Sequence, residues 1–142
     1  DLSFVRKASA RFGSQCIVCS IDVKNIEGEY KIFNQQEGVV DINPLDLAKQ
    51  YQDNGAGEIL LTSVDSDGSA NGYDLELIKL FKGRLNIPVI LNGGMGKPSD
   101  AVKAIENGAD AVAAAYIFHF SQWTPNDVKL ALSENNIPVR SS

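Results

Sequence analysis

Short apolar runs alternate along the chain with amphipathic stretches of helical spacing. Four runs have the length and composition of buried strands: Cys16–Ile21, Glu58–Ser63, Val89–Leu91 and Ala111–Ala115. Each is followed by a loop and a predicted helix, and a further helix, at about Phe4–Phe12, precedes the first run. This order is typical of βαβ units around a parallel sheet.

The predicted helices carry recognisable boundary signals. Two of them start with a capping residue before a proline, at Asn43-Pro44 and Thr124-Pro125. Two end on residues that tolerate left-handed backbone angles, at Asn54-Gly55 and Asn107-Gly108. Because an alanine follows each glycine and leads into a strand, successive units are expected to repeat one plan.

One segment departs from this plan, between Glu27 and Asp41. Within it, Glu29–Phe33 alternates polar and apolar residues, which predicts a hairpin inserted after the first strand. Insertions after the strands are where barrel folds place their functional groups.

Polar residues stand in a consistent register at the strand ends. If Asp22 points to the inside of a barrel, Ser20 shares its face, and in the next strand Thr62 shares a face with Leu60 and Glu58. An open doubly wound sheet is the alternative. A barrel is favoured because two strands each carry a polar residue, Asp22 and Thr62, at the same end.

Four βα units are too few to close such a barrel, which takes about 250 residues and eight strands. The 142 residues predict a single domain, residues 1–142, that forms half of a (β/α)₈ barrel. A half-barrel has two unpaired sheet edges and an uncovered apolar inner face. We therefore expect either a fragment of a longer chain or a half that pairs with another half.

Charge and hydropathy exclude two classes of partner. The net charge is −5 and the isoelectric point about 4.8, so the basic face that nucleic acids require is not expected. No run approaches the roughly 20 apolar residues of a membrane span, and the N-terminus has no signal pattern. These features predict a cytoplasmic protein. A phosphorylated small molecule is compatible with this charge, because helix N-termini bind phosphate without net positive charge.

Cys16 and Cys19 have the C-x-x-C spacing of redox or zinc sites. Residues three apart in a strand point to opposite faces, so we interpret them as two buried, reduced thiols. Neither a metal site nor a cofactor is expected.

A glycine-rich turn directly follows the third strand and precedes a helix, at Asn92-Gly93-Gly94 and Gly96. Glycines let the backbone approach an oxyanion, and the helix start adds N–H donors and a favourable dipole. The sequence predicts a phosphate cradle here, with a sharp structural corner as the alternative.

Hydroxyls and carboxylates cluster where the second strand ends, at Thr62, Ser63 and Asp67. Such a loop suits a polar substrate and proton transfer, and Gly68 would let Asp67 fold over the strand end. The alternative is a solvated acidic loop. We interpret Asp74 as the N-cap of a helix over Leu75–Phe81.

Two further residues are candidates for acid/base chemistry. Asp22 ends an otherwise apolar strand, and a carboxylate shielded from water has a raised pKa, although a loop hydrogen-bond acceptor is the simpler role. His119 is the only histidine and lies between two phenylalanines, which favours a structural role.

Several longer motifs are more specific than any single glycine turn. The longest is Gly55-Ala56-Gly57-Glu58-Ile59-Leu60-Leu61-Thr62-Ser63. The others are Arg11-Phe12-Gly13-Ser14-Gln15, Ser20-Ile21-Asp22-Val23-Lys24, Gly72-Tyr73-Asp74 and Ile117-Phe118-His119-Phe120. Together they resemble the cyclase subunit of imidazole glycerol phosphate synthase, an enzyme of histidine biosynthesis. The resemblance covers essentially the whole chain and matches the C-terminal half of that subunit.

The resemblance implies a reaction and a partner. The family takes ammonia from a glutaminase subunit through the barrel and closes an imidazole ring on a bis-phosphorylated ribulosyl aminoimidazole carboxamide ribotide. A carboxamide ribotide is split off. Asp22 matches one of two acid/base aspartates, and Glu58 matches a glutamate of the ammonia entrance. Gly93 and Gly94 match a phosphate site, while Thr62, Ser63 and Asp67 match residues lining the mouth.

The chain departs from the family pattern at three positions. Ser66 replaces a usual arginine, Asn92 a usual serine before the glycines, and Tyr116 a usual serine after the alanine run. Two of these departures touch the expected phosphate site. With them, the chain resembles a diverged paralogue of the family that delivers ammonia for amidination of a surface sugar. A non-catalytic half-barrel that binds phosphate or self-associates is the third alternative.

Overall fold

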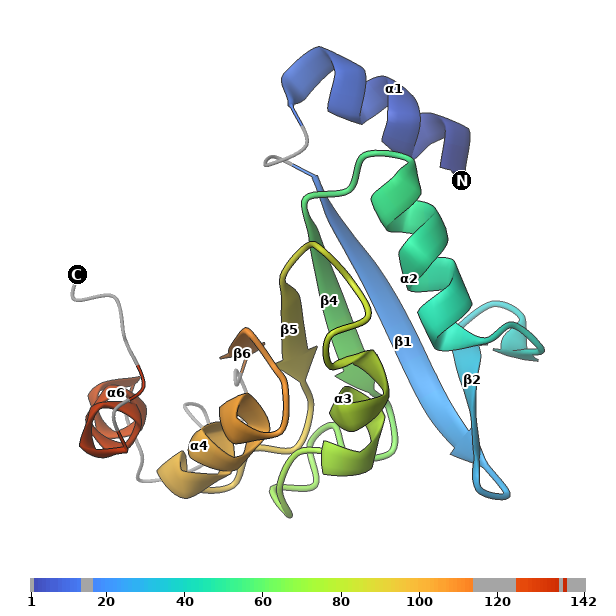
Figure 1. Cartoon of the computed structure of the whole chain (residues 1–142). Coiled ribbons are helices and arrows are strands. Elements are labelled where there is room, and N and C mark those ends of the chain that lie inside the picture. The colour runs from blue at the N-terminus through green and yellow to red at the C-terminus, as the bar shows by residue number, and fades with distance from the viewer. Residues whose placement is uncertain (1, 14–16, 114–124, 136, 138–142) are drawn as a thin grey trace.

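The computed structural model has a mixed six-stranded sheet with its helices packed on one face (Figure 1). The structure describes residues 2–13, 17–113, 125–135 and 137. The helices are α1 Leu2–Phe12, α2 Pro44–Asp53, α3 Leu75–Phe81, α4 Pro98–Glu106 and α6 Pro125–Glu134. The strands are β1 Val18–Ile26, β2 Glu29–Asn34, β3 Gly38–Val40, β4 Glu58–Ser63, β5 Val89–Asn92 and β6 Ala111–Ala113.

The sheet has the order β3-β2-β1-β4-β5-β6. β1, β4, β5 and β6 are parallel neighbours, whereas β2 and β3 add to β1 as antiparallel strands. Each parallel strand precedes a helix along the chain. The predicted α/β class, part of a (β/α)₈ barrel with a hairpin inserted after its first strand, is confirmed.

Local capping explains where the helices begin and end. The Asn43 side chain accepts hydrogen bonds from the backbone N–H groups of Leu45 and Asp46, at 2.9 and 3.1 Å, directly before α2. Asp74 caps α3 in the same way, as predicted, by accepting from the Leu77 N–H at 3.1 Å. These side chains satisfy N–H groups that lack a partner within the helix.

The first strand is longer than the sequence predicts. Cys16–Ile21 was expected, but β1 continues through Asp22 to Ile26, because its last four residues pair with β2. Asp22 therefore does not end its strand; it lies one residue before the last parallel pair, Val23 with Ser63. The inserted segment also contains a third strand, β3, which extends the predicted hairpin.

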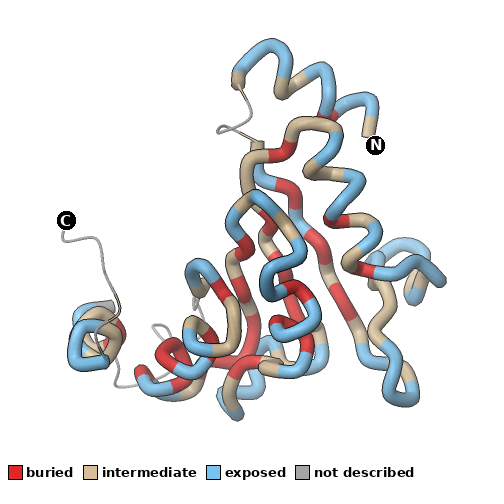
Figure 2. Tube along the Cα trace, viewed as in Figure 1, coloured by how far each residue is buried: buried red, intermediate tan, exposed pale blue. Residues whose placement is uncertain are grey.

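The core lies between the sheet and the helices. Along β1 every second residue, Cys19, Ile21 and Val23, is buried, and this alternation is visible in Figure 2. The same face of β4 and β5 buries Ile59, Leu61, Val89 and Leu91. Each such side chain stabilises the fold by roughly 1.5–3 kcal/mol. The other face of the sheet is more open, with Val18 53% exposed.

None of the helices in the described ranges has the length and apolar character needed to cross a membrane.

Candidate functional site

Three polar side chains stand side by side on the open face of the sheet. The strand register pairs Asp22 of β1 with Thr62 of β4, and Thr62 with Asn92 of β5. Neighbouring strands lie about 4.8 Å apart, so the row spans roughly 10 Å. All three belong to the strand positions that alternate with the buried core residues. The shared strand-end face expected from the sequence is therefore present.

A hydrogen bond joins two members of this row. The Asn92 side-chain amide donates to the Thr62 hydroxyl oxygen at 3.2 Å, and Thr62 is itself buried. The bond fixes the Asn92 amide within the row rather than leaving it free to rotate. Asn92 is thus part of the polar surface of the sheet and not only a link to the glycine turn.

Asp22 has the electrostatic environment of an acid/base group. Burial raises the pKa of its carboxyl group, and the negative charge of Asp67 raises it further. The structure thus brings Asp22 and Asp67 close enough to interact, although 45 positions separate them in the sequence. A carboxyl whose pKa is raised toward neutrality can exchange protons with a substrate more readily.

The raised pKa of Asp22 predicts a pH-dependent loss of stability. Since the folded state binds this proton more tightly than the unfolded state, stability falls as pH rises from the ordinary carboxyl value through the raised folded value. The Asp22→Asn variant lacks this loss. We expect it to be more stable than the unchanged protein at pH 7.5 and equally stable near pH 4, as measured by urea unfolding. The control is Asp53→Asn, which changes an exposed carboxylate at the end of α2. An Asp22→Asn variant that is less stable than the wild-type protein at pH 7.5 would contradict the argument that burial raises the Asp22 pKa.

The glycines of the predicted phosphate cradle have a second role. Gly93 and Gly94 have φ angles of 96° and 118°, which favour glycine. A Cβ on Gly94 would overlap the carbonyl oxygen of Gly72, and one on Gly93 would lie 2.8 Å from the carbonyl oxygen of Ser63. The Gly72 N–H donates to the Gly94 carbonyl at 2.7 Å. The glycines therefore let the turn after β5 pack against the loop after β4, which the sequence did not reveal.

Some of the N–H donors expected for phosphate are already used. The buried Asp100 carboxylate accepts from the N–H groups of Gly96 and Lys97, at 2.9 and 3.1 Å. These two donors belong to the start of α4, where the sequence suggested a ligand site. An anion at this turn would have to use backbone N–H groups other than those of Gly96 and Lys97, such as those of Gly93 and Gly94. The capping role of Asp100 could have been predicted from the sequence, because an acidic residue follows Pro98 within the first turn of the helix.

Ser63 differs from its neighbour Thr62. As the next residue in β4, Ser63 lies on the other face of the sheet, where it pairs with the buried Val23 of β1. It is only 2% exposed. Its hydroxyl accepts from the Ser66 N–H at 3.4 Å, and its carbonyl accepts from the Asp67 N–H at 3.0 Å. The expectation that Ser63 lines the mouth is corrected by this geometry, in which Ser63 holds the start of the loop.

Glu58 lies at the other end of the open face. It starts β4, shares the face of Leu60 and Thr62 by alternation, and is paired with Val18. Four residues of strand place it about 13 Å from Thr62. Glu58 therefore lies at the end of β4 away from Thr62, and its expected place at the ammonia entrance stays a prediction.

A groove of about 660 Å³ lies away from this row. It is formed by the turn of the hairpin, the start of α2 and the outer side of α3, with Tyr30, Leu80 and Arg84 among its residues. The residues of the predicted mouth do not contribute to it. A second, open hollow of about 470 Å³ is lined by Asp22 together with residues such as Phe33 and Tyr51, whereas Thr62 and Asn92 do not contribute to it. The row of Asp22, Thr62 and Asn92 therefore does not share one enclosed cavity in this half-barrel.

Several sequence predictions concern residues outside the described ranges. His119, Tyr116 and Cys16 are among them. Cys19 is a free, buried thiol, and burial raises its pKa. Within the residues that the structure describes, no three His, Cys, Asp or Glu side chains are grouped so that they could hold a metal ion.

The chain was compared with known proteins. Residues 1–124 match the family described as histidine biosynthesis protein. A protein of Campylobacter jejuni, with the provisional name imidazole glycerol phosphate synthase subunit hisF2, is 54% identical over 140 residues, 99% of this chain and 56% of that protein. Two proteins named imidazole glycerol phosphate synthase subunit HisF are also similar, each along 99% of this chain. The one from Endomicrobium trichonymphae is 47% identical and covered to 55% of its length; the one from Dehalococcoides mccartyi is 40% identical and covered to 56%. The chain spans about half the length of these curated relatives.

Proposed function

The chain belongs to the histidine biosynthesis protein family, and from this premise we propose that it forms the C-terminal half of an imidazole glycerol phosphate synthase cyclase. The proposed substrate is a bis-phosphorylated ribulosyl aminoimidazole carboxamide ribotide. Ammonia from a glutaminase subunit condenses with the carbonyl group of the substrate, with loss of one water, and closes the imidazole ring, which yields imidazole glycerol phosphate and a carboxamide ribotide. The reaction is that of a lyase and needs no cofactor.

The observation that carries this proposal is the row of Asp22, Thr62 and Asn92 with a raised pKa at Asp22. Adding ammonia to a carbonyl group and closing a ring both require protons to be moved at neutral pH. A carboxyl group with a raised pKa, standing beside the buried Thr62 hydroxyl and the half-buried Asn92 amide, can transfer them. Asp22 is therefore proposed as one acid/base residue, with the second supplied by the N-terminal half.

The remaining site residues take binding roles in this proposal. Thr62, Asp67 and Asn92 face the sugar, and the backbone of Gly93 and Gly94 holds a phosphate group. Support for the anion site comes from the positive φ angles and from their place between a strand end and a helix start. Glu58, at the opposite end of the same face, is proposed to contact ammonia as it enters.

The open edge of β1 supports the idea of a missing half. Among the described strands, residues 18–22 of β1 pair with β4 alone, since pairing with β2 begins at Val23. The exposed Val18 and the open face next to it leave apolar surface in contact with water. We propose that further βα units of a longer chain, or a second copy of this one, cover that edge and face.

Turnover of the ribotide by the full-length protein with ammonium chloride tests the proposal. We expect imidazole glycerol phosphate and the carboxamide ribotide to form in equal amounts without the glutaminase, and with glutamine once it is added. Purified protein that is folded but forms neither product from the ribotide and ammonium would reject the cyclase proposal.

A second function is favoured by the departures from the family pattern. Asn92 and Ser66 differ from the usual residues, and both lie at the glycine turn, since the Ser66 Cβ would be 3.2 Å from a Cβ on Gly94. In this reading the protein delivers ammonia to a partner that amidinates a surface sugar. Deletion that abolishes sugar amidination but leaves growth without histidine unaffected would support it, whereas a histidine requirement would support the cyclase.

A further inference from the structure

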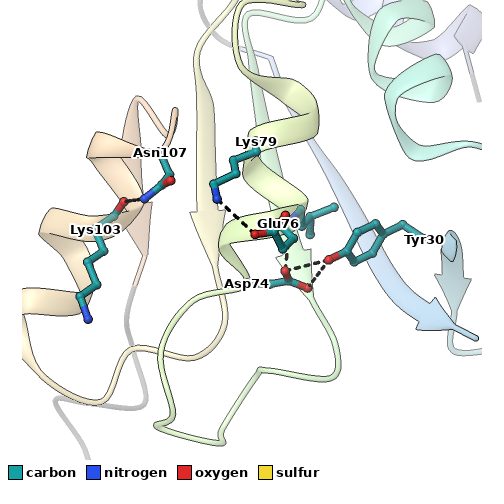
Figure 3. Close-up of polar contacts among 7 residues, drawn as sticks. Tyr30, Asp74, Glu76, Lys79, Lys103 and Asn107 are labelled. Carbon is teal, nitrogen blue, oxygen red and sulfur yellow. Dashed lines mark hydrogen bonds and ion pairs between the residues drawn. The ribbon is translucent and has the colours of Figure 1, made fainter. Parts of the chain in front are cut away.

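A tyrosine of the inserted hairpin reaches the start of α3. The Tyr30 hydroxyl donates to the Asp74 carboxylate, with distances of 2.8 and 3.0 Å to its two oxygens (Figure 3). One of these oxygens also accepts from the Leu77 N–H and so caps α3. The contact joins residues 44 positions apart, and it is partly buried.

β1 and the hairpin hold opposite ends of the loop between β4 and α3. At the start of this loop, residues 64–73, the Asn25 N–H of β1 donates to the Asp65 carboxylate at 2.8 Å, and the Val64 N–H donates to the Val23 carbonyl at 2.9 Å. At the end of the loop, Tyr30 binds Asp74. The start of the loop is therefore held by β1, and its end is held by the hairpin through Tyr30.

The middle of the loop depends on such anchors because its side chains bury little surface, unlike Tyr73 at the end of the loop, which is 7% exposed and belongs to the core. Asp67 and the residues that follow it to Asn71 are exposed. Further along, the Tyr73 hydroxyl donates to the Ala113 carbonyl at 2.8 Å and the Gly72 N–H to the Gly94 carbonyl. Segments with few buried apolar contacts open easily, so losing one polar anchor should be felt along the loop.

We propose that Tyr30 is a positioning residue for the proposed reaction, which through Asp74 holds the loop 64–73 so that Asp67 stays beside Asp22. The inference rests on the proposed function for its catalytic consequence. It assigns a role to the inserted hairpin: the hairpin sets the position of a carboxylate in the mouth without contacting the substrate.

The chemistry of the contact supports a permanent anchor. Burial and the adjoining Asp74 carboxylate raise the pKa of the Tyr30 hydroxyl, and the negative charge of Glu76 acts in the same direction. The hydroxyl therefore remains a donor throughout the physiological pH range. Hydrogen bonds to a carboxylate are stronger than those between neutral groups.

The Tyr30→Phe variant of the full-length protein removes the hydroxyl alone. Hydrogen exchange of the amides in 64–73 is expected to become about tenfold faster, as the loss of one such bond implies. The pKa of Asp22, followed by carboxyl NMR, should fall in part because Asp67 moves away, while the larger raising effect of burial remains. In turnover, kcat should fall about tenfold while KM for the ribotide changes less than about twofold.

Lys79→Gln is the matched control. It breaks the exposed ion pair of Lys79 with Glu76, at 3.1 Å on the same helix, without touching Tyr30 (Figure 3). None of the three measurements should change. Asp74→Asn provides a second variant, since the asparagine can still cap α3 but accepts a weaker bond from Tyr30; it should shift loop exchange in the same direction.

Loop exchange and an Asp22 pKa that are unchanged in Tyr30→Phe would overturn the inference, whatever the activity. Both measurements are independent of turnover. If loop exchange and the Asp22 pKa change as expected but the wild-type protein does not convert the ribotide, the proposed function is wrong. The coupling between the hairpin and the loop is then still supported. A fall in kcat without any change in loop exchange would also contradict the inference.

Discussion

Replacing Asp22 by asparagine is expected to lower kcat for ribotide turnover by about 10²- to 10⁴-fold, the usual contribution of a general acid or base. Asparagine keeps the size and the hydrogen-bonding oxygen of the side chain but cannot exchange a proton. Steady-state kinetics of the full-length protein with saturating ammonium chloride measure the effect. Because Asp22 is argued to move protons rather than to bind, KM for the ribotide should change much less than kcat.

Asp53→Asn controls for the loss of a negative charge. Asp53 is an exposed residue that ends α2, away from the row of site residues, and its replacement should leave kcat within a factor of about two, since surface charges have little effect at this distance. An Asp22→Asn protein that is folded and retains more than a tenth of the original kcat would show that Asp22 is not an acid/base residue.

Replacing Gly94 by alanine should strongly destabilise the protein. The new Cβ would overlap the Gly72 carbonyl, and the φ of 118° is itself unfavourable for alanine. Overpacking of this kind and the strained backbone together cost about 2–5 kcal/mol. Urea unfolding measures the loss, and ribotide binding should weaken as the two loops separate.

Gly83→Ala separates the two causes of that loss. Gly83 also has a positive φ, 70°, but nothing lies within 4 Å of a Cβ placed there. Its replacement should cost about 1 kcal/mol through backbone strain alone. If Gly94→Ala weakens phosphate binding but costs no more stability than Gly83→Ala, the glycines serve the ligand and not the packing of the two loops.

The sequence was sufficient for features that depend on neighbouring residues. Alternation within a strand placed Asp22 and Thr62 on the same face, and the register of β1 with β4 confirms that assignment. The cap at Asn43 and the cap at Asp74 were predicted from single residues and are present. Strand alternation and helix caps can be predicted because the residues involved are close together along the chain.

Contacts between distant segments were not predictable in this way. Nothing in the sequence indicates that Tyr30 donates a hydrogen bond to Asp74. The glycines of the turn also give the same sequence pattern whether their backbone faces a ligand or packs against the Gly72 carbonyl. The extension of β1 beyond Asp22 also depends on pairing with β2. Each of these requires the loops and the hairpin to be placed in space first.

The central claim is that Asp22, Thr62 and the turn at Asn92-Gly93-Gly94 form one mouth for a phosphorylated sugar. A crystal structure of the full-length protein with the ribotide bound tests it most directly. We predict one phosphate group within hydrogen-bonding distance of the Gly93 or Gly94 N–H and the sugar lying across the row toward Asp22. A ribotide bound in the outer groove beside Tyr30 and Arg84, with the row unoccupied, would contradict the account.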